Sequence, residues 1–384
     1  MNKFKNLQNL KVALVYDRVN TRFGGAEQVL LVLHDLFPEA TLFTSVYDKK
    51  EAQWSQVFKV KTSFLQKCRM ARRRHRLFLP LMPLAFENLD LREYDLVISI
   101  TSAEAKGIIT QPGQKHICYL LTPPRYLYSH QQEYLNSRVL FKIPVIKFFT
   151  KKIFNYLTWW DQAAIHRPDY LIPISKLVQQ RVKKYYNLTT LDPIYPPIDV
   201  NLEQPIENWE QLKNLLRLPE KFYLVVSRLV AYKKIDLAIQ ACKKMKKNLI
   251  IVGNGPEYKH LVKLADNNKH IFFLNNQSQK IVNTLMKQAK LFIAPGIDDF
   301  GLSPIQANFF GTPAVINHHS GVAEVLQHKK QALHLNEISL AELINKIKMA
   351  EQIKFNSAEL KQNALKYTKE KFKLNFTKAL KMVL

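Results

Sequence analysis

The sequence predicts an α/β protein of two doubly wound domains, each a parallel sheet with helices on both faces. Short apolar runs alternate with longer amphipathic stretches along all 384 residues. This alternation is typical of parallel strands joined by crossover helices. The length suits two domains of ordinary size, and 47% hydrophobic residues with 23% charged residues are enough to build two cores.

The first domain is expected at residues 1–198. Apolar runs followed by turn residues are typical of buried parallel strands. Strands are expected at Lys11–Tyr16, Thr41–Val46, Tyr94–Ile100, His116–Leu121 and Pro168–Ser175, and helices at Gln28–Leu36 and Val178–Tyr186. The two prolines of Ile194–Asp199 restrict the backbone and predict an extended linker to the second domain.

The second domain is expected at residues 199–365 and repeats the same alternation. Strands are expected at Phe222–Val226, Asn248–Val252, Ile271–Leu274, Leu291–Ala294 and Ala314–Ile316, with a helix at Val282–Ala289. The last segment, 366–384, contains the amphipathic stretch Tyr367–Leu384, which predicts a terminal helix.

The stretch after Leu291–Ala294 carries the strongest sign of a binding site. A helix is expected to open near Leu302–Ser303 with Pro304 in its first turn, where the missing proline amide costs nothing. The remaining free amides and the positive end of the helix dipole suit phosphate oxygens. Asp298, on the loop, and Gln306, in the helix, could line one cavity.

Two cations form a second candidate binding motif. Arg228 and Lys233 lie five residues apart in the loop after an expected strand. Arginine can hold two phosphate oxygens with its planar fork, and lysine adds a movable charge. Lys234 could take the place of Lys233, and the pair could also be two ordinary surface cations.

These motifs together resemble the retaining glycosyltransferases of family 4 (glycosyl transferases group 1), which have the GT-B fold. The matching residues are Asp298-Asp299-Phe300-Gly301-Leu302-Ser303-Pro304-Ile305-Gln306-Ala307 with Gly311 and Pro313, Gly24-Gly25-Ala26-Glu27, and the Arg228–Lys233 spacing. A fourth match, Cys118-Tyr119 with Thr122-Pro123-Pro124-Arg125-Tyr126, resembles the mannosyltransferase branch of the family. The resemblance implies two Rossmann-like domains whose sheets face across a cleft, with a C-terminal helix crossing back to the first domain.

The resemblance also implies roles for individual residues. Arg228 and Lys233 would clamp the diphosphate and Asp298 would contact donor-sugar hydroxyls, which makes these three the expected catalytic set. The implied donor-binding residues are Gly24, Gly25, Gly253, Asp298, Phe300, Gly301, Leu302, Ser303 and Gln306, and the implied acceptor-side residues are Thr122 and Arg125. The chain departs from the family at Leu121, where a histidine is usual, and at Asp298 and Gln306, where glutamates are usual.

The expected function is transfer of a hexose, with mannose from GDP-mannose as the first choice and UDP-sugars as the other donors. The implied acceptor is a lipid-linked saccharide or a cell-surface polysaccharide precursor. No metal or other cofactor is expected, because the cation clamp can neutralise the leaving diphosphate. The alternative is a protein that kept the fold and binds nucleotide sugar or glycan without turnover.

Charge suggests a further partner. Lys and Arg number 57 against 31 Asp and Glu, a formal charge of +26, which favours anionic partners. No nucleic-acid motif is recognisable, so no nucleic-acid partner is expected. The basic and apolar block Ser63–Leu84 lies on an anionic membrane surface or near a lipid-phosphate acceptor, or it is a solvated helix face. Leu140–Trp160 places aromatics beside lysines at helical spacing, which suits a membrane-facing or acceptor-facing helix, or core packing for most of these residues.

The location expected from these features is cytoplasmic, with peripheral attachment to the inner face of the cytoplasmic membrane. Cys68, Cys118 and Cys242 are far apart and lack metal-ligand spacing, so they are expected to be reduced thiols. No apolar run reaches the length of a membrane span.

Overall fold

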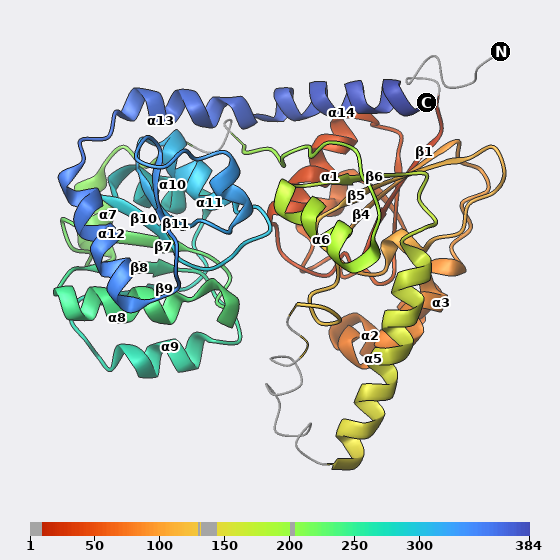
Figure 1. The fold of residues 1–384 in the computed structure, drawn as a ribbon, viewed down its shortest axis with the longest axis horizontal. Coiled ribbons are helices and arrows are strands. Elements are labelled where there is room, and N and C mark those ends of the chain that lie inside the picture. Colours follow the sequence, from red (N-terminus) through yellow and green to blue (C-terminus); the bar gives the residue numbers. More distant parts are fainter. Residues whose placement is uncertain (1–9, 130, 132–143, 200–203) are drawn as a thin grey trace. The chain divides into compact units, whose positions relative to one another are not determined.

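The computed structural model describes residues 10–129, 131, 144–199 and 204–384, and divides into two compact units. Unit 1 comprises Met1–Ile194 and Lys373–Leu384, and unit 2 comprises Tyr195–Phe372. The first boundary falls just before the Pro196-Pro197 pair. Figure 1 shows a central sheet covered by helices in each unit.

The sheet of unit 1 has six parallel strands in the order β3-β2-β1-β4-β5-β6. The strands are β1 (Val12–Tyr16), β2 (Thr41–Thr44), β3 (Lys59–Thr62), β4 (Leu96–Thr101), β5 (Lys115–Leu120) and β6 (Tyr170–Pro173). Every residue of β1, β2 and β4 is buried, which explains their apolar sequences. β6 is an edge strand, so Pro173 at its end removes no ladder hydrogen bond between two strands.

The helices of unit 1 cover this sheet and add a side lobe. They are α1 (Gly25–Leu36), α2 (Arg69–Arg73), α3 (Met82–Glu87), α5 (Pro144–Ala164) and α6 (Lys176–Tyr186), with 3₁₀ turns η3 (Gln53–Val57), η4 (Phe64–Lys67), η5 (His75–Leu81) and η6 (Ala105–Gly107). Phe154 and Leu157 of α5 form a buried cluster with Leu65, Ala71, Leu79, Met82 and Ala85. This cluster fixes α5 against the segment from η4 to α3, beside which it runs in Figure 1.

The sheet of unit 2 has the same parallel topology in the order β12-β11-β10-β7-β8-β9. The strands are β7 (Tyr223–Val226), β8 (Leu249–Val252), β9 (Ile271–Leu274), β10 (Leu291–Ala294), β11 (Ala314–Asn317) and β12 (Ala332–Leu335). The helices are α7 (Trp209–Leu215), α8 (Ile235–Met245), α9 (Tyr258–Ala265), α10 (Gln279–Gln288), α11 (Leu302–Phe309), α12 (Leu340–Gln352) and α13 (Ser357–Ala364), with 3₁₀ turns η8 (Ala231–Lys233), η9 (Gly321–Glu324) and η10 (Leu365–Tyr367).

Helices cover both faces of this second sheet. Residues of α8, α9 and α12 join the strands in one large buried cluster, and α10 and α11 lie on the opposite side of the sheet in Figure 1. The doubly wound architecture expected from the sequence is therefore confirmed in both units.

The last helix, α14 (Lys369–Val383), links the two units, since its first residues belong to unit 2 and Lys373 onward belongs to unit 1. Within unit 1, Phe376 is buried and its ring meets Tyr119 of β5 edge-on, with centroids 6.1 Å apart. Lys373 Nζ lies 2.9 Å from Asp35 Oδ2 on α1. The predicted return of the C-terminal helix to the first domain is confirmed.

The sequence analysis misses two strands. β3 is an edge strand whose two lysines, Lys59 and Lys61, are exposed, so it has no continuous apolar run. β12 is also an edge strand, and His334 interrupts its apolar residues although all four are buried. Residues 140–143 of the predicted helical stretch lie outside the described residues.

Candidate functional site

The candidate site of unit 2 lies where its strand order reverses. β7 and β10 are hydrogen-bonded neighbours, and successive connections leave this pair in opposite directions across the sheet. Ligands of open parallel sheets bind at such a point, beyond the carboxyl ends of the strands. Lys233 follows β7 and Asp298 follows β10, so the topology brings together residues 65 positions apart.

Lys233 and Asp298 form an ion pair. The Lys233 Nζ donates a hydrogen bond of 2.6 Å to Asp298 Oδ2, with 23% and 12% of the two side chains exposed. Lys233 ends the η8 turn, and Lys234 takes a left-handed conformation with φ 54° before α8 begins. The contact to Asp298 therefore belongs to Lys233 and not to Lys234.

Ser320 and Gly321 hold the loop that carries Asp298. The Asp298 amide donates to Ser320 Oγ at 2.9 Å, and that hydroxyl donates to the Asp298 carbonyl at 3.1 Å. The Gly321 amide donates to the same carbonyl at 2.9 Å. The sequence analysis does not identify these two residues, because their role depends on a contact between separate loops.

Gly296 allows the two halves of the site to approach each other. A Cβ at this position would lie 2.3 Å from the Tyr232 carbonyl oxygen and 2.6 Å from Lys233 Cα. Both are backbone atoms, so a side chain cannot fit without moving the turn that carries Lys233. The short Lys233–Asp298 contact thus depends on a glycine that the sequence analysis does not single out.

The start of α11 completes the site. As predicted, α11 begins at Leu302 with Pro304 in its first turn, after Gly301 with φ 96°. No side chain caps this end, so the Leu302 and Ser303 amides remain suited to an anion.

A small pocket opens between these parts. Its volume is about 60 Å³, and its lining residues are Val225, Val226, Ser227, Lys233, Ile235, Phe292, Ile293, Ala294, Pro295, Gly296, Asp298, Gly301, Leu302 and Ser303. About 10–15 Å³ on this measure holds one water molecule, so the pocket has room for a small group of atoms beside Lys233 and Asp298.

The pocket is not lined by Arg228, which was expected to be catalytic, or by Gly253 and Gln306, which were expected to bind the donor. Arg228 is exposed in the loop after β7 and makes no side-chain ion pair with any described residue. Gly253, with φ 135°, packs so closely on this loop that a Cβ would lie 2.0 Å from the Ser227 carbonyl oxygen. Gln306 is half-buried on α11.

Phe300 is buried, and its ring stacks on another aromatic ring instead of facing the pocket. Tyr195, the first residue of unit 2, stacks on it with centroids 5.3 Å apart and planes 19° apart. Burial, together with a hydrogen bond to the Glu324 carboxylate, raises the pKa of Tyr195. Tyr195, at the start of unit 2, is therefore anchored by Phe300 to the loop between Asp298 and Gly301 and by Glu324 to η9.

Gly24 and Gly25 lie in unit 1, at the start of α1 after the carboxyl end of β1. Glu27 of the same motif points into the protein: it is buried and accepts a 2.8 Å hydrogen bond from the Tyr16 hydroxyl. Burial raises the pKa of Glu27. This glutamate fastens the glycine turn and leaves both glycines exposed.

Unit 1 has its own reversal point, between β1 and β4. Arg18 Nη2 lies 2.6 Å from Glu104 Oε2, and the Tyr126 hydroxyl donates to Glu104 Oε1 at 2.8 Å. Burial raises the pKa of Glu104, against the opposing effect of the Arg18 charge. Neither Arg18 nor Glu104 lies in a sequence motif that would predict this contact.

The expected acceptor-side residues follow β5 in unit 1. Thr122 is buried, and its hydroxyl lies 3.3 Å from Arg181 Nη1 of α6. Arg125 is half-buried in the same loop. The structure leaves their role a prediction.

Among the described residues, no three His, Cys, Asp or Glu side chains gather as a metal site would require. None of the helices in that part of the chain combines the length and the apolar character needed to cross a bilayer.

Comparisons with known proteins show what this chain is similar to. Residues 207–371, which lie within unit 2, match the family model described as glycosyl transferases group 1. An uncharacterized glycosyltransferase of Methanocaldococcus jannaschii is 28% identical over 44% of this chain and 49% of its own length. The α-1,3/1,6-mannosyltransferase ALG2 of Kluyveromyces lactis is 24% identical over 64% of this chain and 55% of its own length. The chain therefore spans about half the length of these two relatives.

A solved structure resembles the whole fold. The Anabaena protein HepE in complex with UDP superposes with a TM-score of 0.68 at 16% identity, over 97% of this chain and all of that one. At this identity the likeness shows the fold alone, which is GT-B.

Proposed function

We propose that this chain transfers a hexose from a nucleotide sugar with retention of anomeric configuration, because residues 207–371 match the glycosyl transferases group 1 model and the fold is GT-B. The observation that carries the proposal is the contact of Lys233 with Asp298 beside the uncapped start of α11. A cation, a carboxylate and free amides are the groups that a sugar diphosphate needs.

In the proposed reaction the bond between the sugar C1 and the diphosphate oxygen breaks as an acceptor hydroxyl attacks from the same face. The acceptor proton passes to the departing phosphate oxygen, so no protein base is required. Lys233 and the α11 amides stabilise the negative charge that grows on the diphosphate. Arg228, exposed in the loop that leads to Lys233, adds a second cation that can turn toward the ligand. We propose that these cations make a metal ion unnecessary.

The first donor to test is GDP-mannose, because one relative is named a mannosyltransferase. UDP-sugars come second, because the solved HepE structure contains UDP. The proposed acceptor is a lipid-linked saccharide or a cell-surface polysaccharide precursor, reached by an enzyme attached to the inner face of the cytoplasmic membrane. The excess of 57 basic over 31 acidic residues supports an anionic acceptor or surface.

The deciding experiment measures nucleoside diphosphate release and sugar transfer from GDP- and UDP-sugars, with and without EDTA. Turnover of one donor that persists in EDTA is expected, and NMR of the product should show the anomeric configuration of the donor. If no donor is transferred or hydrolysed, the chain is not a transferase for these donors. Loss of turnover in EDTA that added Mg²⁺ restores would refute the metal-independent step.

A second candidate is a protein that binds nucleotide sugar or glycan without turnover. Three departures from the family pattern favour it: Leu121 stands where the family usually has a histidine, and Asp298 and Gln306 stand where it usually has glutamates. Isothermal calorimetry separates the two candidates. Donor binding with no transfer or hydrolysis would support the second, whereas turnover excludes it.

A further inference from the structure

Unit 1 carries a surface that the proposed chemistry does not use, made of α5 and the segment from η4 to α3. Its sequences are unusual in charge: Ser63–Leu84 and Pro144–Trp160 contain basic residues and no aspartate or glutamate. The two acidic residues that complete these elements are held by partners within unit 1: Glu87 of α3 pairs with Arg167, and Asp161 of α5 is buried against Lys106. A cluster of buried apolar side chains joins the two segments, so they form one surface and not two.

The outer face of α5 is aromatic and basic. Phe148, Lys152, Tyr156 and Trp159 recur at steps of four, four and three residues, so they share one face of the helix. All four side chains are exposed, Trp159 by 69%, and the Lys152 ammonium lies 4.8 Å from the centre of the Phe148 ring. Phe154, Leu157 and Trp160 take the opposite face, into the protein.

The neighbouring segment has the same character. Met70, Leu77 and Leu81 are large apolar side chains that are exposed there; Phe64 and Leu84 are exposed as well, but they line a separate hollow that also contains Asp90 and Glu93. Arg69 and Arg74 are exposed in the same segment. Core packing, the alternative that the sequence left open for residues 140–160, accounts for the buried residues of α5 but not for its exposed rings. A solvated helix face, the alternative for Ser63–Leu84, does not explain why large apolar side chains are exposed there.

Apolar exposure on this scale marks an interaction surface. The kind of partner follows from the chemistry. Tryptophan, tyrosine and phenylalanine rings settle at the boundary between lipid headgroups and acyl chains, and lysine and arginine near them gain from negative headgroups. An anionic leaflet repels carboxylates, and no exposed carboxylate lies among the aromatic and basic residues of α5. The α5 face therefore suits an anionic leaflet better than it suits a protein partner.

We infer that α5 and the segment from η4 to α3 dock this chain onto an anionic phospholipid surface, with Trp159 and Phe148 entering the interface. The contact is peripheral and independent of donor binding, since none of these residues lines the pocket at Lys233. It does not depend on the proposed transferase activity.

Vesicle binding of the full chain tests the inference. Sedimentation with vesicles of phosphatidylcholine alone is compared with vesicles that also contain phosphatidylglycerol. We expect binding to the anionic vesicles that weakens as salt is added, together with a blue shift of tryptophan fluorescence. In Trp159→Phe the binding should persist while most of the blue shift disappears.

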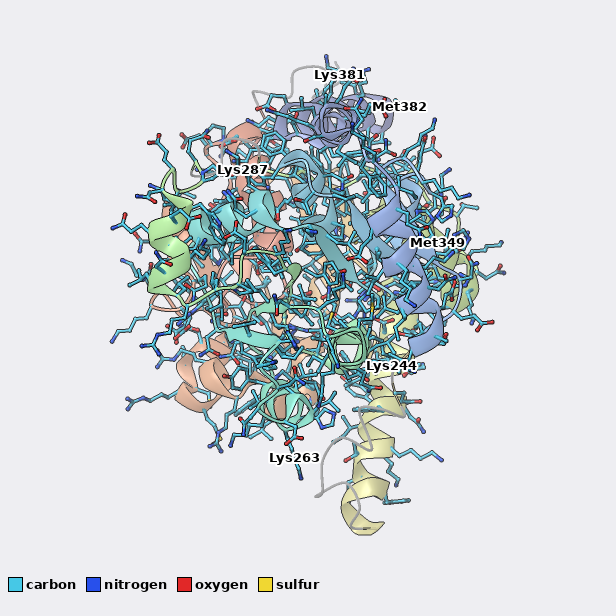
Figure 2. All side chains as sticks on the ribbon, turned by 90° about the vertical axis from the view of Figure 1, so that its left-hand side faces the viewer. Lys244, Lys263, Lys287, Met349, Lys381 and Met382 are labelled. Atoms are coloured by element: carbon cyan, nitrogen blue, oxygen red, sulfur yellow. The ribbon has the colours of Figure 1, made fainter. Side chains whose placement is uncertain are left out.

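Charge reversal locates the contact. Lys151 and Lys152 are exposed on α5, and Lys244 and Lys263 are exposed on α8 and α9 of unit 2, where Figure 2 labels them. The double variant Lys151→Glu/Lys152→Glu should bind anionic vesicles roughly tenfold or more weakly. The matched variant Lys244→Glu/Lys263→Glu makes the same change in net charge and should bind nearly as the parent chain does.

Three outcomes would overturn the inference. They are no binding to anionic vesicles, equal binding to both kinds of vesicle, and equal loss in the two double variants, which would show that only net charge matters. Tight binding to vesicles with no fluorescence change would exclude entry of Trp159. Donor hydrolysis measured in the same variants reports separately on the proposed enzyme activity.

Discussion

The Lys233 ammonium lies 2.6 Å from the Asp298 carboxylate, so the two charges of the candidate site neutralise each other in the free chain. A sugar diphosphate offers each of them a replacement: its phosphate oxygens can take the ammonium, and its sugar hydroxyls can take the carboxylate. Donor binding would then exchange one set of charge-assisted hydrogen bonds for another, and neither charge would be left without a partner.

The first prediction concerns Lys233. Lys233→Ala removes the cation that faces the leaving group and leaves Asp298 without its partner, so we expect transfer to fall by about 10²–10³-fold. Steady-state kinetics with the best donor measures it. Lys234→Ala is the control, because Lys234 lies next in the chain but does not contact Asp298. Equal losses in the two variants would show that the Lys233 contact has no special role.

How far the sequence alone leads depends on whether a residue acts through a local pattern. Lys233, Asp298 and Ser303 lie in short motifs, and the alternation of strands and helices places them at one sheet edge; the structure brings all three to one pocket. Gly296 and Ser320 act only through contacts with separate loops, which no local pattern records. The edge strands β3 and β12 are not predicted from the sequence because their apolar runs are short or interrupted.

The second prediction concerns Gly296. In Gly296→Ala the new methyl group would collide with the backbone of Tyr232 and Lys233. The turn must shift, which separates Lys233 from Asp298, so the donor KM should rise and transfer should fall. Gly113→Ala is the contrast: Gly113 has φ 88° but open space around it, so alanine there should lower the melting temperature without changing the KM. A normal KM in Gly296→Ala would contradict this account.

The third prediction concerns the stacking of Tyr195 on Phe300. Tyr195→Leu loses both the ring contact and the hydrogen bond to Glu324, whereas Tyr195→Phe loses only the second. An aromatic pair contributes about 0.5–1.5 kcal/mol, so the donor KM should rise by roughly two- to tenfold in the leucine variant and less in the phenylalanine variant. Tyr258→Leu breaks an aromatic pair with Phe273, and it should not change the KM.

The fourth prediction concerns pH. His116 is fully buried, and burial, with a smaller effect of the Arg167 charge, lowers its pKa to about 3. The unfolded chain, with a histidine pKa near 6.5, therefore binds a proton that the folded chain does not between about pH 6.5 and 3. Stability should be lost as the pH falls through this window, by up to about 1.4 kcal/mol per pH unit from this one group.

Urea unfolding across that pH range measures the effect of His116. His116→Gln should lose less stability on acidification than the parent chain does, because glutamine takes up no proton. His166→Gln, at an exposed histidine of the same unit, serves as the control and should follow the parent chain. The same slope in all three proteins would show that His116 does not titrate on unfolding.

The last prediction concerns the buried pair Lys106 and Asp161. Lys106 Nζ lies 2.5 Å from Asp161 Oδ1, and the other carboxylate oxygen accepts hydrogen bonds from Tyr128 and Tyr186. Lys106→Met would leave a buried carboxylate without its counter-charge, which costs about 3–5 kcal/mol of the free energy of unfolding.

A matched variant separates the effect of burial on the free energy of unfolding from the effect of losing a charge pair. Lys115→Met breaks the half-exposed pair with Asp169, whose charged atoms lie 3.7 Å apart, and should cost at most about 1 kcal/mol. The double variant Lys106→Met/Asp161→Leu removes both buried charges and should recover part of the loss, though the two tyrosine hydroxyls then lose their acceptor. Equal costs for Lys106→Met and Lys115→Met would mean that the buried carboxylate finds another partner or takes up a proton. The stability of unit 1 would then rest on its apolar clusters and not on this pair.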